Sequence, residues 1–141
     1  MELRGAVVTV TGASAGIGWA TAWAFASKGA TVVASARRVV ALDMSNSAKP
    51  VEASRVDFDE RQQPHWLALD DQSNRIIVAN SNEQSESRLW MLQMDTVSGR
   101  LTFDYTFHDR GDDRPGVSFE REQWPHGHTG RGVPHGSVFV R

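Results

Sequence analysis

Residues 11–18, with the sequence TGASAGIG, are the feature that most limits the fold of this chain. They follow the run AVVTV at 6–10 and precede an alanine-rich stretch that ends near residue 28. A β-branched run bounded by turn residues favours a buried strand, and glycine permits backbone angles that other residues avoid. We therefore predict a strand at 6–10, a glycine turn and a helix over 16–28. The run TVVAS at 31–35 predicts a second strand, parallel to the first through a right-handed β-α-β crossover.

The predicted helix carries apolar and small residues at helical spacing, which we expect to face the two strands. Gly29 stands where the C-cap of this helix is expected. The residues predicted to form the buried helix face are Ile17, Ala20, Thr21, Ala24 and Phe25.

The glycines of this turn have a chemical use as well as a conformational one. Gly12, Gly16 and Gly18 allow the backbone to approach a pyrophosphate closely, and the helix N-terminus offers free N–H groups and the positive end of its dipole. A glycine triplet alone is weak support for a nucleotide site. This triplet lies between a predicted buried strand and a predicted amphipathic helix, as such a site requires. The segment therefore indicates nucleotide binding.

The motif resembles the TGxxxGxG motif of the short-chain dehydrogenase/reductase family, and residues 3–38 resemble the first β-α-β unit of that family. The resemblance implies an NAD(P) cofactor. Ser35, Ala36, Arg37 and Arg38 follow the second strand without an acidic residue for a ribose 2′-hydroxyl, so Arg37 or Arg38 would face a 2′-phosphate, which favours NADP over NAD. For Arg38, a plain solvated charge is the alternative. The resemblance implies further cofactor contacts at Gly12, Ser14, Gly16, Ile17 and Gly18.

The resemblance also implies a catalytic Tyr-x-x-x-Lys pair and a substrate-holding serine, and this chain departs from that pattern. Its one tyrosine, Tyr105, precedes Asp109 by four positions, and a carboxylate there would raise the pKa of a phenol. Its lysines are Lys28 and Lys49, so no Tyr-x-x-x-Lys pair exists. We assign no catalytic residue and expect the chain not to be an active oxidoreductase by itself.

The composition changes near residue 38. Alanine occurs ten times in residues 1–38 and five times in residues 39–141, and the net charge changes from +3 to −5. The strand-turn-strand order recurs after about fifty residues, a period typical of propeller blades. The second segment, residues 39–141, contains the stretches PHWLALDDQSNRIIVAN, RLWMLQMDTVSGRLTFD and RPGVSFEREQWPHGHTGRGVPHG. With these stretches it resembles the C-terminal blades of bacterial seven-bladed propellers of the phosphogluconolactonase-like and selenium-binding-like groups. Short β-rich runs that predict strands lie at 39–43, 66–70, 75–80, 88–95, 101–107 and 137–140.

These patterns predict an α+β chimera of two domains. Residues 1–38 would form a truncated Rossmann-type β-α-β unit, and residues 39–141 an antiparallel, incomplete β-propeller with one full blade at 64–107. A closed propeller needs about four to eight blades, so we expect a homo-oligomer or a partner chain that completes it. Two alternatives remain open for function. In the first, the chain is a propeller fragment acting as a binding or assembly module. In the second, it is a rearranged gene product without selected activity.

Histidines near the C-terminus are weak candidates for a metal site. His126 and His128 would lie on one face of a strand, and His135 could join them as a third ligand. The favoured alternative is a Gly- and Pro-rich loop whose histidines bind backbone groups, so no metal is assigned. Three tryptophans at alternating strand positions favour core packing over ligand stacking. They are Trp66, Trp90 and Trp124.

Composition narrows the remaining classes. The chain has no cysteine, which excludes disulfides, thiolate catalysis and cysteine-based zinc sites. A net charge of −2 gives no support to a nucleic-acid or membrane surface as partner. The N-terminal apolar run is too short for a secretory signal, and no run approaches the ~18 apolar residues of a membrane span. We expect a cytoplasmic protein.

Overall fold

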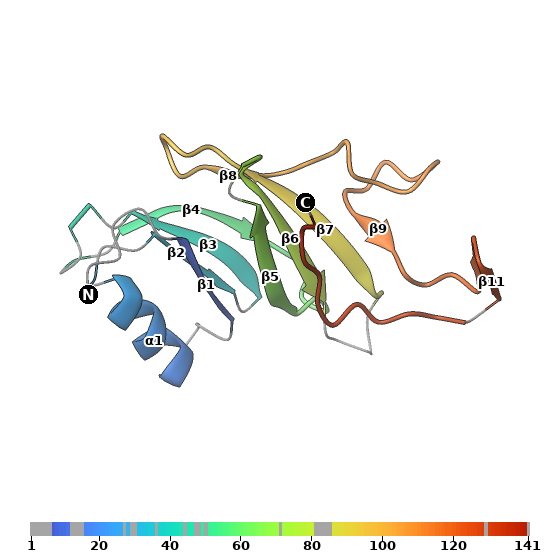
Figure 1. Cartoon of the computed structure of the whole chain (residues 1–141), viewed down its shortest axis with the longest axis horizontal. Coiled ribbons are helices and arrows are strands. Elements are labelled where there is room, and N and C mark those ends of the chain that lie inside the picture. Colours follow the sequence, from blue (N-terminus) through green and yellow to red (C-terminus); the bar gives the residue numbers. More distant parts are fainter. Residues whose placement is uncertain are drawn as a thin grey trace.

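Two β-sheets and one helix form the main body of the chain in a computed structural model (Figure 1). The structure describes residues 7–11, 16–26, 28, 31–35, 37–43, 45–46, 49, 51–70, 72–80, 86–128 and 130–140. The elements are β1 (Val7–Thr11), α1 (Gly16–Ala26), β2 (Thr31–Ser35), β3 (Arg38–Asp43), β4 (Val51–Asp57), β5 (Pro64–Asp70), β6 (Arg75–Asn80), β7 (Arg88–Met94), β8 (Leu101–Phe103), β9 (Val117–Ser118), β10 (Gln123–Trp124) and β11 (Gly127–His128).

The first sheet has the order β1-β2-β3-β4. Strands β1 and β2 are parallel and joined by α1, with Thr11 opposite Ser35 at their carboxyl ends. Strand β3 then turns back and pairs antiparallel with β2, and β4 pairs antiparallel with β3. The turn between β2 and β3 is short, and so direct a return allows only antiparallel pairing.

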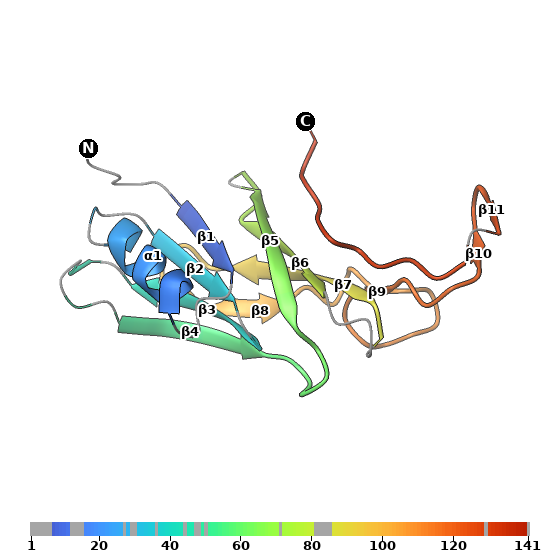
Figure 2. The ribbon, with the colours of Figure 1, turned by 90° about the horizontal axis from the view of Figure 1, so that it is seen from below.

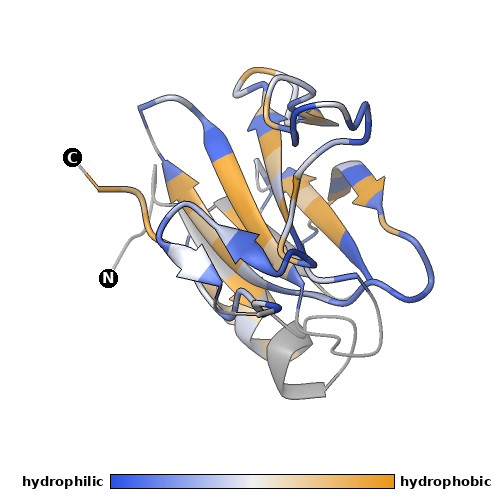
Figure 3. Cartoon of the chain, turned by 90° about the vertical axis from the view of Figure 1, so that its right-hand side faces the viewer, coloured by the Kyte–Doolittle hydropathy of each residue, from blue (hydrophilic) through white to orange (hydrophobic). Residues whose placement is uncertain are grey.

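The second sheet is an antiparallel meander of β5, β6, β7 and β8, in which β9 pairs with the N-terminal half of β7. Asn74 in the turn between β5 and β6 has φ +55°, a left-handed conformation that asparagine tolerates. The small hairpin of β10 and β11 lies apart from both sheets (Figure 1). Apolar residues are concentrated in the strands, and the connecting loops are mostly hydrophilic (Figure 3).

The main hydrophobic core lies between the two sheets. Trp90 of β7 is 3% exposed, and its ring meets Phe58, which follows β4, edge-on at 4.8 Å between centroids. Ser54 of β4 ties the sheets together at the rim, because its hydroxyl donates to the Gly99 carbonyl at 2.8 Å and accepts from the Leu101 N–H. The buried core residues are Val39, Ala41, Val56, Leu67, Ile76, Val78, Trp90, Leu92, Met94 and Leu101.

Helix α1 lies against β1 and β2 on the face of the first sheet away from that core (Figure 2). Val39 pairs with Ser35 in the register, so these two side chains share one face of the sheet. Val32 lies three residues before Ser35 in β2, and successive strand side chains alternate between faces, so Val32 points to the opposite face. Val32 and Val10 are buried, and Ala22 of α1 is 2% exposed. The molecule is therefore layered as helix, first sheet and second sheet.

The predicted fold class is wrong. The β-α-β order occurs, but the sheet continues with antiparallel strands, so α1 and its neighbours are not the start of a parallel Rossmann sheet. Residues 64–103 form a four-stranded meander, yet it packs on the first sheet, and the described residues form no closed propeller. The predicted domain boundary after Arg38 falls at the first residue of β3, within one sheet. The division into two domains and a completing partner chain stay predictions.

Two local predictions are also wrong. Among the helix residues whose burial is described, 20–25, Ala22 is buried, whereas Ala20, Ala24 and Phe25 of the predicted face are exposed. Apolar residues surround this helix almost evenly, so periodicity does not decide which side meets the sheet. Residues 137–140 form no strand, because they join no sheet ladder, and the Ser137 carbonyl accepts its hydrogen bond from the Trp66 side chain instead. Within the described ranges, no helix has the length and apolar character needed to cross a membrane.

Candidate functional site

The glycine motif occupies the connection between β1 and α1. Strand β1 ends at Thr11 and α1 begins at Gly16. Gly16, Ile17 and Gly18 form the first turn of α1, where backbone N–H groups have no partner within the helix and the dipole is positive. Gly12 and Ser14, the other predicted cofactor contacts, lie outside the described residues. The helix N-terminus thus stands beside the carboxyl end of a strand, the arrangement that binds phosphate groups in α/β proteins.

The two predicted arginines follow the neighbouring strand. Because β1 and β2 are parallel, their carboxyl ends lie at the same edge of the sheet, and Arg37 comes two residues after the end of β2. Its side chain is exposed, and its carbonyl accepts a hydrogen bond from the Phe58 N–H at 3.4 Å. Arg38 is also exposed and opens β3, opposite Asp57 in the register. Arg37 is therefore the better placed of the two for a phosphate.

The position of β1 in the first sheet can be compared with that of the first strand in doubly wound folds, which bind dinucleotides. In doubly wound folds the ligand lies outside the carboxyl ends of the strands, between the first strand and the neighbour on its far side. Here β1 has β2 as its hydrogen-bonded neighbour and is the edge strand of the described sheet. Its surroundings beyond that edge include β5 of the second sheet. The described residues thus place no further strand of the first sheet on the far side of β1.

The residues closest in type to a catalytic pair lie far apart in the fold. Tyr105 follows β8 and is 63% exposed, and its ring meets Phe103 edge-on at 6.3 Å between centroids. Lys28 follows α1 on the other side of the first sheet and is exposed. The described structure thus brings no lysine to the tyrosine, and it offers no pair for proton transfer there.

The predicted weak metal candidates do not come together. The His126 ring stacks on Trp124 at 6.3 Å between centroids, and Nδ1 of His128 lies 2.8 Å from the Glu122 carbonyl oxygen. His135 lies instead beside His65 of β5. No group of three or more His, Cys, Asp or Glu side chains in the described ranges is arranged to hold a metal ion. That His126, His128 and His135 together hold no metal ion stays a prediction.

A hollow of about 570 Å³ lies at the far end of the second sheet, along its turns. Asp95 in this hollow accepts hydrogen bonds from the N–H groups of Ser98 and Val97 and from the Ser98 hydroxyl. These bonds, first those of Ser98, lower the pKa of the Asp95 carboxyl, so it stabilises the turn as an anion. The lining residues are Asn74, Gln93, Met94, Asp95, Thr96, Arg100 and Thr102.

An ionic cluster of Glu86, Arg88, Asp112 and Arg114 was missed by sequence reasoning. Arg88 is 2% exposed, and its guanidinium donates to Glu86 and to Asp112, each at 2.8 Å. The Arg114 side chain is more exposed than that of Arg88 and forms ion pairs with the same two carboxylates. The only available signal was a charged residue at the start of an apolar strand, RLWMLQM. The cluster fastens the loop after β8 to β7 through the contact of Arg88 with Asp112.

The charges of this cluster lower both carboxyl pKa values. Burial raises the pKa of Glu86, but hydrogen bonds from Arg88, Ser118 and Arg114 outweigh it, so the pKa falls below the ordinary 4.5. Hydrogen bonds from the Arg114 side chain and N–H, and then from Arg88, lower the pKa of Asp112 far below the ordinary 3.8. Both groups therefore favour the folded state as anions.

This arrangement predicts acid destabilisation. A carboxyl whose pKa is lower in the folded than in the unfolded state adds stability above its unfolded pKa, and that stability is lost as the pH falls through the folded pKa. We expect the melting temperature to fall as the pH drops from about 5 towards 2. Thermal unfolding of the Asp112→Asn variant should show a shallower pH dependence than the unaltered chain. Asp113→Asn is the control and should keep the original slope, and parallel curves for all three proteins would contradict the assignment.

Comparison with known proteins bears on the N-terminal segment. Residues 6–72 match the short chain dehydrogenase family. The similarity to this family begins at the start of β1, includes the glycine motif and α1, and continues through β5, well past Arg38. No curated protein and no solved structure matches the chain. The N-terminal segment is thus short-chain-dehydrogenase-like, and the resemblance inferred from TGASAGIG is confirmed for that segment.

Proposed function

We propose that this chain binds a nicotinamide dinucleotide, with NADP(H) preferred, at the turn between β1 and α1. The observation that carries the proposal is the glycine motif leading from the end of β1 at Thr11 into α1 at Gly16, with β2 parallel beside β1. The match of residues 6–72 to short chain dehydrogenases supports it, since that family uses NAD(P). Both observations concern the N-terminal segment, which has 67 residues in the family match.

The proposed contacts follow from the chemistry of each group. The N–H groups in the first turn of α1, at Gly16, Ile17 and Gly18, would donate to the pyrophosphate, and the helix dipole would favour its negative charge. The Arg37 guanidinium would pair with the 2′-phosphate, because it offers several donors in a planar fork. A bound nicotinamide ring would supply a hydride.

We further propose that the chain alone does not transfer that hydride. Tyr105 is exposed at the end of the second sheet and has no lysine beside it in the described structure. The described residues therefore do not form the Tyr-x-x-x-Lys pair that the family resemblance implies for proton transfer. The neighbour of β1 on its far side is β5 of the second sheet and not a strand of the same sheet, so the nicotinamide half would lack the second crevice wall of a doubly wound fold.

A titration with NADPH tests the binding proposal. Saturable enhancement of NADPH fluorescence should accompany a rise in melting temperature, with stabilisation of about 2.7 kcal/mol at a ligand concentration 100 times the Kd. Arg37→Glu should weaken NADPH binding about tenfold or more and leave NADH binding nearly unchanged, because one charge-assisted bond to phosphate is lost.

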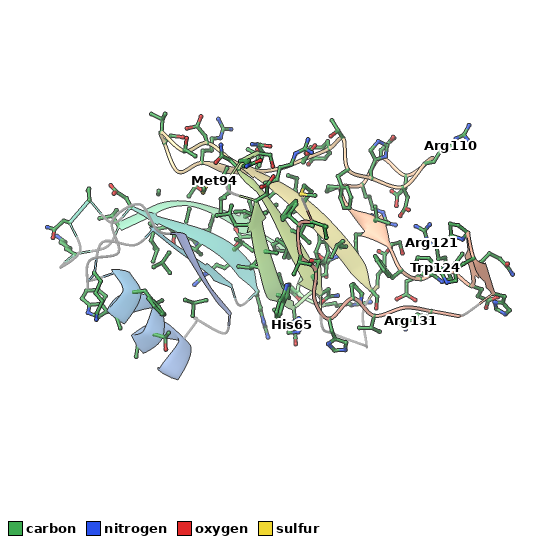
Figure 4. The ribbon with its side chains drawn as sticks, in the orientation of Figure 1. His65, Met94, Arg110, Arg121, Trp124 and Arg131 are labelled. Atoms are coloured by element: carbon green, nitrogen blue, oxygen red, sulfur yellow. The ribbon has the colours of Figure 1, made fainter. Side chains whose placement is uncertain are left out.

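Arg110→Glu is the matched control, since Arg110 is exposed on the loop at the opposite end of the molecule (Figure 4). It should bind NADPH as the unaltered chain does. Absence of saturable NADPH binding would refute the proposed function. Equal weakening by the two charge reversals would refute the role given to Arg37.

A further inference from the structure

The C-terminal tail, residues 133–140, lies against Trp66 of β5, and buried polar atoms without a hydrogen-bond partner occur there. In the described part of the chain, His65 Nδ1, Arg88 Nε and Ser137 Oγ are buried and lack a hydrogen-bond partner. Two of these atoms lie where the tail meets β5, because His65 is in β5 and Ser137 is in the tail. Buried polar atoms are nearly always bonded, so such a pair indicates a missing partner such as a water or an ion.

Contacts with Trp66 hold the tail in place. The Trp66 indole N–H donates to the Ser137 carbonyl at 3.0 Å. Gly136 lies directly on the indole, and a Cβ added there would come within 3.3 Å of the ring. These contacts bring the exposed His135 opposite the half-buried His65, with ring centroids 5.7 Å apart and planes at 90°. Two imidazoles that are distant in sequence thus lie side by side where the tail meets β5.

We propose that His65 and His135 bind one divalent transition-metal ion, of the zinc class, between their rings. Imidazole nitrogen is a preferred ligand of such ions. Two imidazoles on one tetrahedral zinc, with Zn–N distances of about 2.0–2.1 Å, have ring centres about 5 Å apart. The observed 5.7 Å requires only a small closure, and His135 lies on an irregular segment able to make it.

The ion would fasten the tail to β5. Water would complete its coordination, since the described residues offer no third His, Cys, Asp or Glu ligand at this position. The site differs from a His126 and His128 pair, because those rings are held by Trp124 and by the Glu122 carbonyl. Coordination through His65 Nδ1 would give this buried atom a partner that the described residues do not supply.

Calorimetric titration of the full chain with zinc chloride tests the site. The unaltered chain should bind one Zn²⁺, and His135→Asn should weaken binding at least about tenfold, because losing even an outer-shell partner costs about 10–100-fold. His135 is exposed, so this variant should fold normally, and His65→Asn should act alike. The matched control, His126→Asn with His128→Asn, should keep the original affinity.

Hydrogen exchange tests whether bound Zn²⁺ fastens the tail, which the binding affinity does not report. Zn²⁺ should slow amide exchange in residues 136–140 of the unaltered chain and not in His135→Asn. Three results would overturn the proposal: no Zn²⁺ binding, binding that survives His135→Asn, or loss of binding in the control instead. Binding through His135 without slower exchange of the tail would overturn its role as a fastening.

Discussion

Replacing Arg88 by methionine is expected to lower the free energy of unfolding by about 3 kcal/mol, since removing one partner from a buried ion pair typically costs about 3–5 kcal/mol. The side chain is 2% exposed, and its guanidinium donates to the carbonyls of Gly116, at 2.8 Å, and Pro115, at 3.2 Å. Both carbonyls would lose a donor. The lower end of the range applies because Glu86 and Asp112 are each about a quarter exposed and keep Arg114.

Denaturant unfolding of Arg88→Met and Arg114→Met measures this effect. Arg114 contacts the same two carboxylates, but its side chain is 63% exposed, so its removal should cost less than about 1 kcal/mol. A clear difference between the two variants would show that burial of the cation, and not its charge alone, holds the loop after β8. Equal losses would contradict this account of the cluster.

Replacing Trp90 by alanine is expected to cost about 3–5 kcal/mol, the usual range for a buried tryptophan. Trp90 belongs to β7 of the second sheet, and its edge-on partner Phe58 directly follows β4 of the first. Phe103 of β8 packs against Phe58 in turn, at 5.4 Å between centroids. Truncation would therefore open a cavity where the two sheets meet, and neighbouring rings would fill only part of it.

Trp23→Ala is the control for this variant, because Trp23 lies on α1 and is 43% exposed. It should cost about 1 kcal/mol, in keeping with its partial burial. Both free energies come from guanidinium unfolding followed by far-ultraviolet circular dichroism. If Trp90→Ala were no more destabilising than Trp23→Ala, the core between the sheets would not hold the molecule together.

Local sequence patterns placed several elements well. The helix was expected at 16–28 and occupies Gly16–Ala26, and the strands expected at 31–35 and 75–80 have those bounds in the structure. Their signals are β-branched runs, helix-forming alanines and turn residues, which act through the backbone within a few positions. The glycine motif belongs to the same class, since its use depends on strand, turn and helix being adjacent in the chain.

Tertiary structure decided the features that depend on partners distant in sequence. Whether β3 pairs parallel or antiparallel with β2, and whether the meander stacks on the first sheet or in a ring of blades, depends on how apolar faces find each other. The buried face of α1 was settled in the same way, by the packing of the helix on β1 and β2. A strand pattern shows that a face is apolar but not what covers it.

The sites divide along the same line. Sequence alone predicted a phosphate-binding turn at residues 11–18 and determined that the chain has no Tyr-x-x-x-Lys pair, because both depend on residue type and near spacing. Only the tertiary structure decided that β1 lies at a sheet edge, that Arg88 meets Asp112, and that His65 meets His135. The last two pairs are 24 and 70 residues apart, and packing of the whole chain brings such residues together.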